Sequence, residues 1–229
     1  MSPDQARQLQ KQMANHVSRE NEVDEPRLIA GSDISAPDLS GVAHAAVVVL
    51  RYPGLEVVEV QVVEGKLLFP YVPGLLSFRE APLILSAFTN LSNKPDLLLV
   101  DGQGIAHPRR FGIASHLGVF LNMPTIGCAK SRLCGWHRPL PDTKAGSHTE
   151  LMDKDEVIGA VVITKEHLAP LYISIGHKVD LSTAIFWVME CCRGYRLPEP
   201  CRLAHLAAGG KHVALKSSMN IYGSDSAKL

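Results

Sequence analysis

The chain has 229 residues, of which 46% are hydrophobic, and this is enough for one domain with a full apolar core. Lysine and arginine balance aspartate and glutamate at 23 each, so the zero net charge gives no overall attraction to nucleic acid. The five cysteines form no CxxC pair, which argues against a zinc finger and a disulfide framework and favours reduced thiols.

The amino-terminal residues lack the features of a signal peptide, and no apolar run approaches the length of a membrane span. We therefore expect a cytoplasmic protein with no membrane association, and we expect a monomer. Charge is uneven along the chain: residues 101–140 carry five Lys or Arg against one acid. This basic segment suits contact with phosphates, although a solvated surface explains it equally well.

Residues 4–20 have the spacing of an amphipathic helix, with Leu9, Met13 and Val17 on its apolar stripe. Three strands are expected next, joined by short turns into an antiparallel meander that residues 64–66 close. They cover residues 27–35, 41–52 and 55–63.

Residues 70–80 begin with two prolines that stiffen the segment and hold Tyr71 outward. A helix is expected to open at Ser77-x-x-Glu80. This pattern is a capping box, which alone explains Glu80, but the same carboxylate could instead face the strand ends as part of a site.

Residues 97–100 form an apolar run typical of a buried parallel strand, and it ends on Asp101 and a Gly-x-Gly turn. A buried carboxylate at a strand end needs a metal, hydrogen-bond donors or water. Pro108 is expected in the first turn of the next helix. A short strand over residues 124–129 then leads into Lys130.

The carboxyl-terminal part begins with a polar stretch, residues 134–156, that we expect to be a surface loop. Strands at 157–164 and 171–175 follow, then a helix capped by Asp180 and a short helix with His205. The order βββ-α-β-α-β predicts an α/β, ribonuclease-H-like fold with a mixed sheet between helices. We expect one catalytic domain over residues 1–210 and a flexible tail over 211–229.

Asp33 and Asp101 are the first candidates for chemistry. Asp33 interrupts an apolar strand, where it is either a turn residue or a metal ligand. If the two strands are neighbours, both carboxylates can reach one cation, and oxygen ligands suit Mg²⁺. Local pattern alone favours structural roles for His205, Lys130 and Tyr71.

Several long motifs in the same order make the chain similar to the endonuclease V family, the deoxyinosine 3′ endonucleases. They span nearly the whole chain and are Gly31–Asp33, Pro70–Glu80, Asp101–Gly112, Gly127–Ser131 and Gly194–Pro200. One departure is Gln103, where several relatives have His or Asn.

The resemblance implies Mg²⁺-dependent hydrolysis, with Mn²⁺ able to substitute, of the second phosphodiester bond 3′ to deoxyinosine in DNA repair. It also assigns site residues. The implied catalytic residues are Asp33, Glu80, Asp101, Lys130 and His205, of which Asp33, Asp101 and Glu80 bind metal. A wedge at the lesion is Pro70, Tyr71, Val72 and Pro73. The pocket for the displaced hypoxanthine is Gly74, Leu76, Gly102, Gly112, Ile113 and Gly127. Phosphate contacts are Arg79, His107, Arg109, His116 and Ser131, with Arg110 as a further backbone contact.

The energetics of base extrusion agree with this assignment. A weakly paired base costs least to extrude, and a rigid aromatic side chain can fill the gap that it leaves in the base stack. Two rival hypotheses stay open. The main substrate could be inosine in single-stranded RNA, since a pocket that reads hypoxanthine need not read the sugar. A non-catalytic nucleic-acid-binding module is the other, and the presence of all three acids disfavours it.

Overall fold

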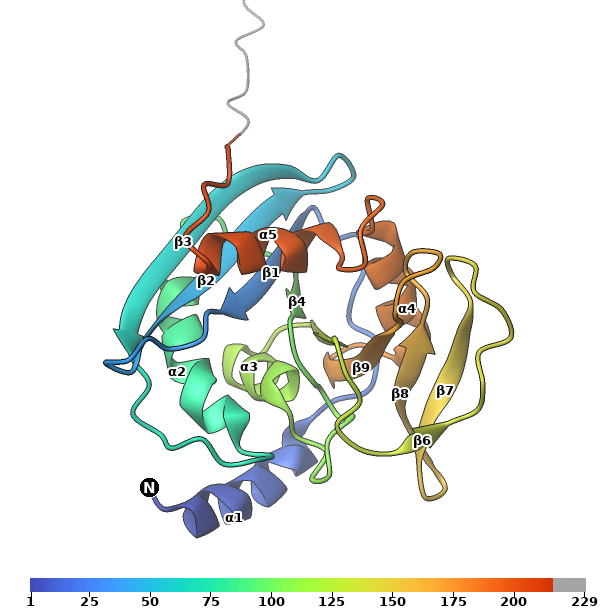
Figure 1. Ribbon diagram of the computed structural model, residues 1–229, viewed down its shortest axis with the longest axis horizontal. Coiled ribbons are helices and arrows are strands. Elements are labelled where there is room, and N and C mark those ends of the chain that lie inside the picture. Colours follow the sequence, from blue (N-terminus) through green and yellow to red (C-terminus); the bar gives the residue numbers. More distant parts are fainter. Residues whose placement is uncertain (216–229) are drawn as a thin grey trace, which may run out of the picture.

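The computed structural model describes residues 1–215, which form one mixed sheet with helices on both faces (Figure 1). The strands are β1 (Leu28–Ile34), β2 (Val42–Arg51), β3 (Glu56–Lys66), β4 (Leu97–Val100), β5 (Thr125–Ala129), β6 (Trp136–His137), β7 (His148–Asp153), β8 (Glu156–Val162) and β9 (Leu171–His177). The helices are α1 (Pro3–Met13), the 3-10 helix η1 (Ala14–His16), α2 (Leu76–Thr89), α3 (Ile113–Leu121), α4 (Leu181–Glu190) and α5 (Glu199–Ala208).

The strand order is β3-β2-β1-β4-β5-β9-β8-β7-β6. The antiparallel pairing of β1 with β2 and of β2 with β3 confirms the predicted meander. β1, β4 and β5 are parallel neighbours at the centre, and β9, β8, β7 and β6 continue the sheet in antiparallel fashion. This is the ribonuclease-H-like arrangement that the element order predicted.

Alternation along the central strands divides the apolar residues between two cores. On β2, Val48 and Leu50 face the core under α4 and α5, whereas Val47 and Val49 face the core under α2 and α3. Successive side chains of a strand point to opposite faces, so a sheet covered on both sides needs apolar residues at every position. The run of buried residues from Ala45 to Leu50 meets this need.

The amino-terminal helix is shorter than predicted and buries a different face. α1 ends at Met13, and its buried residues are Ala6 and Gln10, while Leu9 is exposed. The predicted stripe was therefore wrong. Ala6 packs against Leu75 and Phe78, so α1 covers the segment that joins β3 to α2.

Three other boundaries differ from the prediction. Residues 64–66 continue β3, because they pair with β2 as far as Lys66. The predicted loop at 134–156 contains β6 and β7, which extend the sheet from β8. The helix expected from Pro108 starts only at Ile113, because Arg110 has a φ of 55° and a left-handed residue breaks the helix.

No helix within residues 1–215 is both long and apolar enough to cross a membrane. Of the tail predicted at 211–229, residues 216–229 lie outside the described residues. Before them, Val213 packs against the core under α5.

Candidate active site

Two aspartates lie side by side at the carboxyl ends of neighbouring parallel strands. Ser32 of β1 stands opposite Val100 of β4, and Asp33 and Asp101 are the next residues on the two strands. The backbone N–H of Asp101 donates to the carbonyl oxygen of Ser32 at 3.1 Å, which holds this register. Ligands of open α/β sheets bind at such strand ends, so the sheet itself creates the acidic site.

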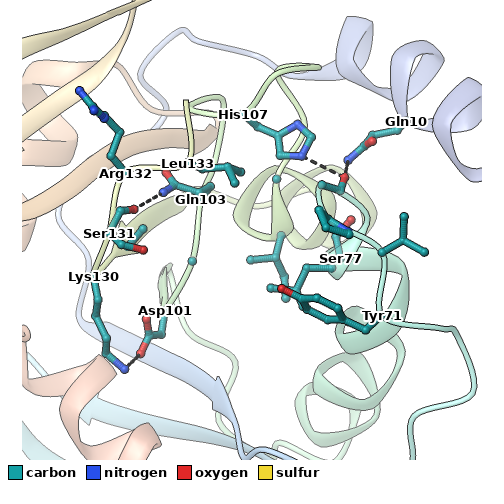
Figure 2. Close-up of a pocket in the computed structure, with 18 residues that line it drawn as sticks. Gln10, Tyr71, Ser77, Asp101, Gln103, His107, Lys130, Ser131, Arg132 and Leu133 are labelled. Atoms are coloured by element: carbon teal, nitrogen blue, oxygen red, sulfur yellow. Dashed lines mark hydrogen bonds and ion pairs between the residues drawn. The ribbon is translucent and has the colours of Figure 1, made fainter. Parts of the chain in front are cut away.

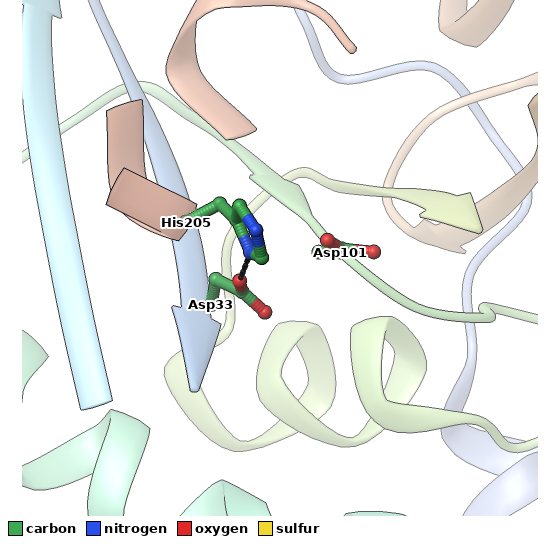
Figure 3. A group of neighbouring side chains, drawn as sticks. All are labelled: Asp33, Asp101 and His205. Atoms are coloured by element: carbon green, nitrogen blue, oxygen red, sulfur yellow. Dashed lines mark hydrogen bonds and ion pairs between the residues drawn. The ribbon is translucent and has the colours of Figure 1, made fainter. Parts of the chain in front are cut away.

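His205 and Lys130 reach the two aspartates from other elements. His205 of α5 places its Nδ1 2.6 Å from Oδ2 of Asp33. Lys130, directly after β5, places its Nζ 2.5 Å from Oδ2 of Asp101. Asp33, Asp101 and His205 each offer one ligand atom, and these atoms all lie within 4.8 Å of one another. Figure 3 shows the three side chains together. Two carboxylates and an imidazole form a donor set that suits a small divalent cation.

Gly31 explains how α5 can deliver His205. A Cβ at Gly31 would lie 2.1 Å from the backbone carbon and oxygen of Pro200, at the start of α5. Only glycine lets the helix lie this close to β1, two residues before Asp33. The motifs Gly31–Asp33 and Gly194–Pro200 are therefore two sides of one packing contact.

Glu80 lies on α2 near the two aspartates. Burial and the charge of Asp33 raise the pKa of Glu80 to about 7. The capping-box interpretation was wrong, because the N-cap is Leu75 without a side-chain hydrogen bond and the Ser77 hydroxyl is buried and unpartnered. Among the described residues, Glu80 is also outside the group whose ligand atoms meet within 4.8 Å.

Burial and the neighbouring charge of Asp33 also raise the pKa of Asp101, and the Lys130 ammonium lowers it. The carboxylates therefore repel one another in a partly desolvated site, and one lysine offsets only part of this repulsion. A bound cation would relieve it, since an opposite charge favours the ionised form of a carboxyl group.

A cavity of about 380 Å³ has Asp101 in its wall (Figure 2). Asp101 and Lys130 lie on one side of it, and Tyr71 and Ser77 lie on the other. Its other lining residues include five of the six predicted pocket positions, namely Gly74, Leu76, Gly102, Gly112 and Ile113. The volume is in the range of small-molecule sites, and the mixed apolar and polar lining suits a planar base.

Gly127 does not line this cavity, so that part of the pocket prediction needs correction. A Cβ at Gly127 would lie 2.5 Å from the backbone nitrogen of Gly104 and 2.7 Å from the carbonyl oxygen of Gly102. The glycine instead allows the turn after β4 to lie directly on β5. Its effect on the site is to position that turn.

The predicted wedge, Pro70–Pro73, belongs to the loop between β3 and α2. Tyr71 is 72% exposed at the cavity edge, as the stiff Pro-x-x-Pro segment predicted. Gly74 ends the segment with a φ of +76°, a left-handed conformation that favours glycine. An aromatic ring is thus held in solvent beside the cavity.

The predicted phosphate contacts have mixed outcomes. His107 is 3% exposed and bonds the carbonyl oxygen of Gly74, and burial lowers its pKa to about 4. Burial also lowers the pKa of His116 to about 4, and its ring packs against Phe78 and Phe111. Burial therefore disfavours the charged form of both rings, and His107 already bonds within the protein. Their assignment as phosphate contacts stays a prediction.

The arginines are also engaged within the protein. Arg110 pairs with Asp153 at 2.7 Å and with Glu156 at 2.8 Å. Its predicted contact with the backbone of the nucleic acid is therefore not supported. Arg109 donates to Gly74, and Arg79 donates to the carbonyl oxygen of Phe69. Ser131 lines the cavity and is exposed. Arg79, Arg109 and Ser131 keep donors for a phosphate and stay predictions.

Sequence reasoning missed two residues that support the site. Arg196 donates to the carbonyl oxygen of Lys130 at 2.6 Å and to that of Pro170 at 2.8 Å, which fixes the backbone beneath the lysine. Gln10 is fully buried and reaches Gly74 from α1. The signal for Gln10 was a polar residue on the same helix face as Ala6, and the predicted Leu9 stripe obscured it.

Comparison with known proteins decides the family. The endonuclease V family model matches residues 11–206. This chain belongs to the endonuclease V family. Members are deoxyinosine-specific DNA repair endonucleases, so the chain is a hydrolase. Endonuclease V of Dehalococcoides mccartyi is 54% identical over 91% of this chain and 93% of its own. Endonuclease V of Gloeobacter violaceus is 53% identical over 90% of this chain and 84% of its own.

Solved endonuclease V structures agree in fold over the same span. The Streptomyces avermitilis protein superposes with a TM-score of 0.86 at 36% identity, covering 91% of this chain and 92% of that one. The catalytic domain of human endonuclease V gives 0.84 at 31%, covering 90% and 94%. The Ciona intestinalis protein, solved with a 23-residue DNA containing an inosine followed by a ribo-adenosine, gives 0.78 at 26%, covering 92% and 98%.

Proposed function

We propose that this endonuclease V binds deoxyinosine in DNA and hydrolyses the second phosphodiester bond 3′ to it, leaving 3′-hydroxyl and 5′-phosphate ends. One observation carries the proposal: Asp101 and Lys130 belong both to the acidic site and to the wall of the cavity. A base held in the cavity would therefore keep the phosphodiester bonds on its 3′ side close to the carboxylates. The inosine-containing DNA bound by the Ciona intestinalis relative supports the same substrate.

Asp33 and Asp101 would hold a divalent cation, which we propose to be Mg²⁺. His205 lies at the same point, and Glu80 flanks it. When bound, the cation supplies an activated nucleophile and stabilises charge on the phosphate. Mn²⁺ accepts imidazole nitrogen more readily than Mg²⁺ does, so His205 provides a reason for Mn²⁺ to substitute.

The chain's own residues then have separate tasks. Tyr71 would enter the base stack and keep the lesion extruded, because its ring is exposed on a stiff loop at the cavity edge. Lys130 would place its ammonium against the phosphate. Glu80 can hold or release a proton near neutral pH, because its pKa is about 7.

Replacement of Asp101 by Asn tests the proposal. The change keeps the side-chain size but removes a charge from the metal site. We expect nicking of a deoxyinosine duplex to fall by about 1000-fold, because a metal supplies several kcal/mol of transition-state stabilisation. Single-turnover cleavage of an end-labelled oligonucleotide in Mg²⁺ measures the rate and maps the cut.

Asp155→Asn is the matched control, since Asp155 is exposed on the turn between β7 and β8. It should cleave like the wild-type protein. Cleavage by Asp101→Asn at the wild-type rate would contradict the metal assignment. A cut at another bond would contradict the proposed position of hydrolysis.

Inosine in single-stranded RNA is a second candidate substrate. The relevant observation is that the Ciona intestinalis protein was solved with DNA in which a ribo-adenosine follows the inosine. That relative accommodates a 2′-hydroxyl next to the lesion. Matched DNA and RNA oligonucleotides, each with and without inosine, separate the candidates by their kcat/KM values.

A further inference from the structure

The carbonyl oxygen of Gly74, at the end of the predicted wedge, receives three hydrogen bonds. Its donors are Gln10 Nε2 at 3.1 Å, His107 Nε2 at 3.0 Å and Arg109 Nη2 at 2.7 Å. A carbonyl oxygen has two lone pairs, so three donors saturate it. We call these four residues the Gly74 cluster. Figure 2 shows Gln10 and His107 converging on this oxygen.

The bonding of each side chain fixes its orientation. The backbone N–H of Arg109 donates to His107 Nδ1 at 3.1 Å, so the ring proton is on Nε2 and points at Gly74. Gln10 Nε2 also donates to the carbonyl oxygen of Phe111 at 2.7 Å, and Gln10 Oε1 accepts from Arg109 Nε. These partners exclude the flipped amide of Gln10.

Gln10 therefore bridges two functional segments. Gly74 closes the wedge loop, whereas Phe111 and Arg109 belong to the segment that starts at Asp101. Gln10 is fully buried although it lies on the first helix of the chain, and Ala6 of the same helix packs on Leu75. Nothing else in α1 is buried.

We propose that Gln10 is a positioning residue that holds the wedge loop at a set distance from the metal-binding carboxylates. Without Gln10, Gly74 keeps only the donors of His107 and Arg109. Arg109 Nε then loses the acceptor that orients it, and the carbonyl oxygen of Phe111 loses its side-chain donor. The wedge would then move relative to the cut site, and extrusion of a paired base would suffer most. A single-stranded substrate needs no strand separation and would suffer least. This part rests on the proposed function.

The test compares Gln10→Leu with Gln8→Leu, because Gln8 is exposed on the same helix. Hydrogen exchange reports on the loop without substrate. Exchange of residues 70–76 should accelerate roughly 10-fold in Gln10→Leu, as expected for loss of buried hydrogen bonds, with α2 beyond residue 80 unchanged. Gln8→Leu should match the wild-type protein.

Activity supplies the second readout. Gln10→Leu should lower kcat/KM roughly 10-fold on a deoxyinosine duplex and less than about 2-fold on the same single strand. Gln10→Asn, which is one methylene shorter, should show the same pattern more weakly and serves if the leucine variant does not fold. Unchanged exchange, or equal losses on both substrates, would overturn the inference. If exchange accelerates in Gln10→Leu but the wild-type protein never cleaves deoxyinosine, the inference about the loop stands and the proposed function fails.

Discussion

At the scale of single residues, the raised pKa of the Glu80 carboxyl group gives a testable prediction about stability. Burial and the charge of Asp33 keep its proton bound until about pH 7. In the unfolded chain the same group loses its proton near its ordinary pKa of 4.5. Between these values the folded state binds more protons than the unfolded state, so the free energy of unfolding falls as pH rises.

Glu80→Gln should therefore stabilise the metal-free protein at alkaline pH. Glutamine stays neutral and escapes the decline, so the stability difference should be near zero at pH 4 and reach about 3 kcal/mol at pH 8. Urea unfolding in EDTA at several pH values measures it. Glu166→Gln, on an exposed turn, controls for loss of a surface charge. A difference that does not grow with pH would contradict the assigned cause.

At the scale of elements, the active site depends on how closely α5 approaches β1. Gly31 permits that approach, and α5 then carries His205 to Asp33. The helix also covers β2 and buries Cys201 and Ala204 in the core. The candidate metal site and the core packing therefore depend on the same contact between α5 and β1.

Gly31→Ala should lower both the stability of the fold and the affinity for Mn²⁺. The added methyl group meets the backbone of Pro200, which cannot move without shifting α5, so we expect a loss of about 1–3 kcal/mol in stability. Mn²⁺ affinity should also fall, because His205 moves away from Asp33. Urea unfolding and metal titration measure the two effects.

Gly54→Ala is the control for Gly31→Ala. Its added Cβ would meet only the Glu56 carboxylate, the far end of a flexible side chain that can rotate away. It should retain Mn²⁺ affinity. Wild-type metal affinity in Gly31→Ala would show that α5 does not position His205.

At the scale of the whole molecule, the carboxyl ends of the central strands bring four distant parts of the chain together. β1 and β4 supply the carboxylates, α5 supplies His205, and the loop before α2 supplies Tyr71. The cavity lies between the wedge loop and the strand ends (Figure 2). Under the proposed function, recognition and hydrolysis would be adjacent and would share Asp101 and Lys130, while Tyr71 and His205 come from separate elements.

Tyr71→Ala should separate the two activities. Binding to a deoxyinosine duplex should weaken by about 1–3 kcal/mol through lost base stacking, whereas cleavage of an already open strand should change less. Fluorescence anisotropy in EDTA and single-turnover cleavage provide the two measurements. Leu68→Ala is the control, since Leu68 is 90% exposed on the same loop but does not line the cavity. Equal losses on both substrates would argue against a wedge.

Local sequence determined much of this protein. Alternation and apolar runs identified the central strands and their meander, Asp180 capped α4 as predicted, and the motifs indicated the family. These features depend on residues that are close together in the sequence, which is why the sequence pattern predicts them. The two aspartates were also predictable as a pair, because the carboxyl ends of parallel strands meet at one edge.

Only the tertiary structure decided what each polar residue contacts. The Ser77-x-x-Glu80 pattern matches a capping box with Ser77 as the N-cap, yet the N-cap is Leu75, two residues earlier, and the charge of Asp33 raises the pKa of Glu80. His107 and Arg110 lie in a basic stretch but bond within the protein. The sequence pattern assigned no role to Gln10, which is buried and bonds Gly74 and Phe111. Burial and partners depend on residues far away in the chain, so composition and spacing could not reveal them.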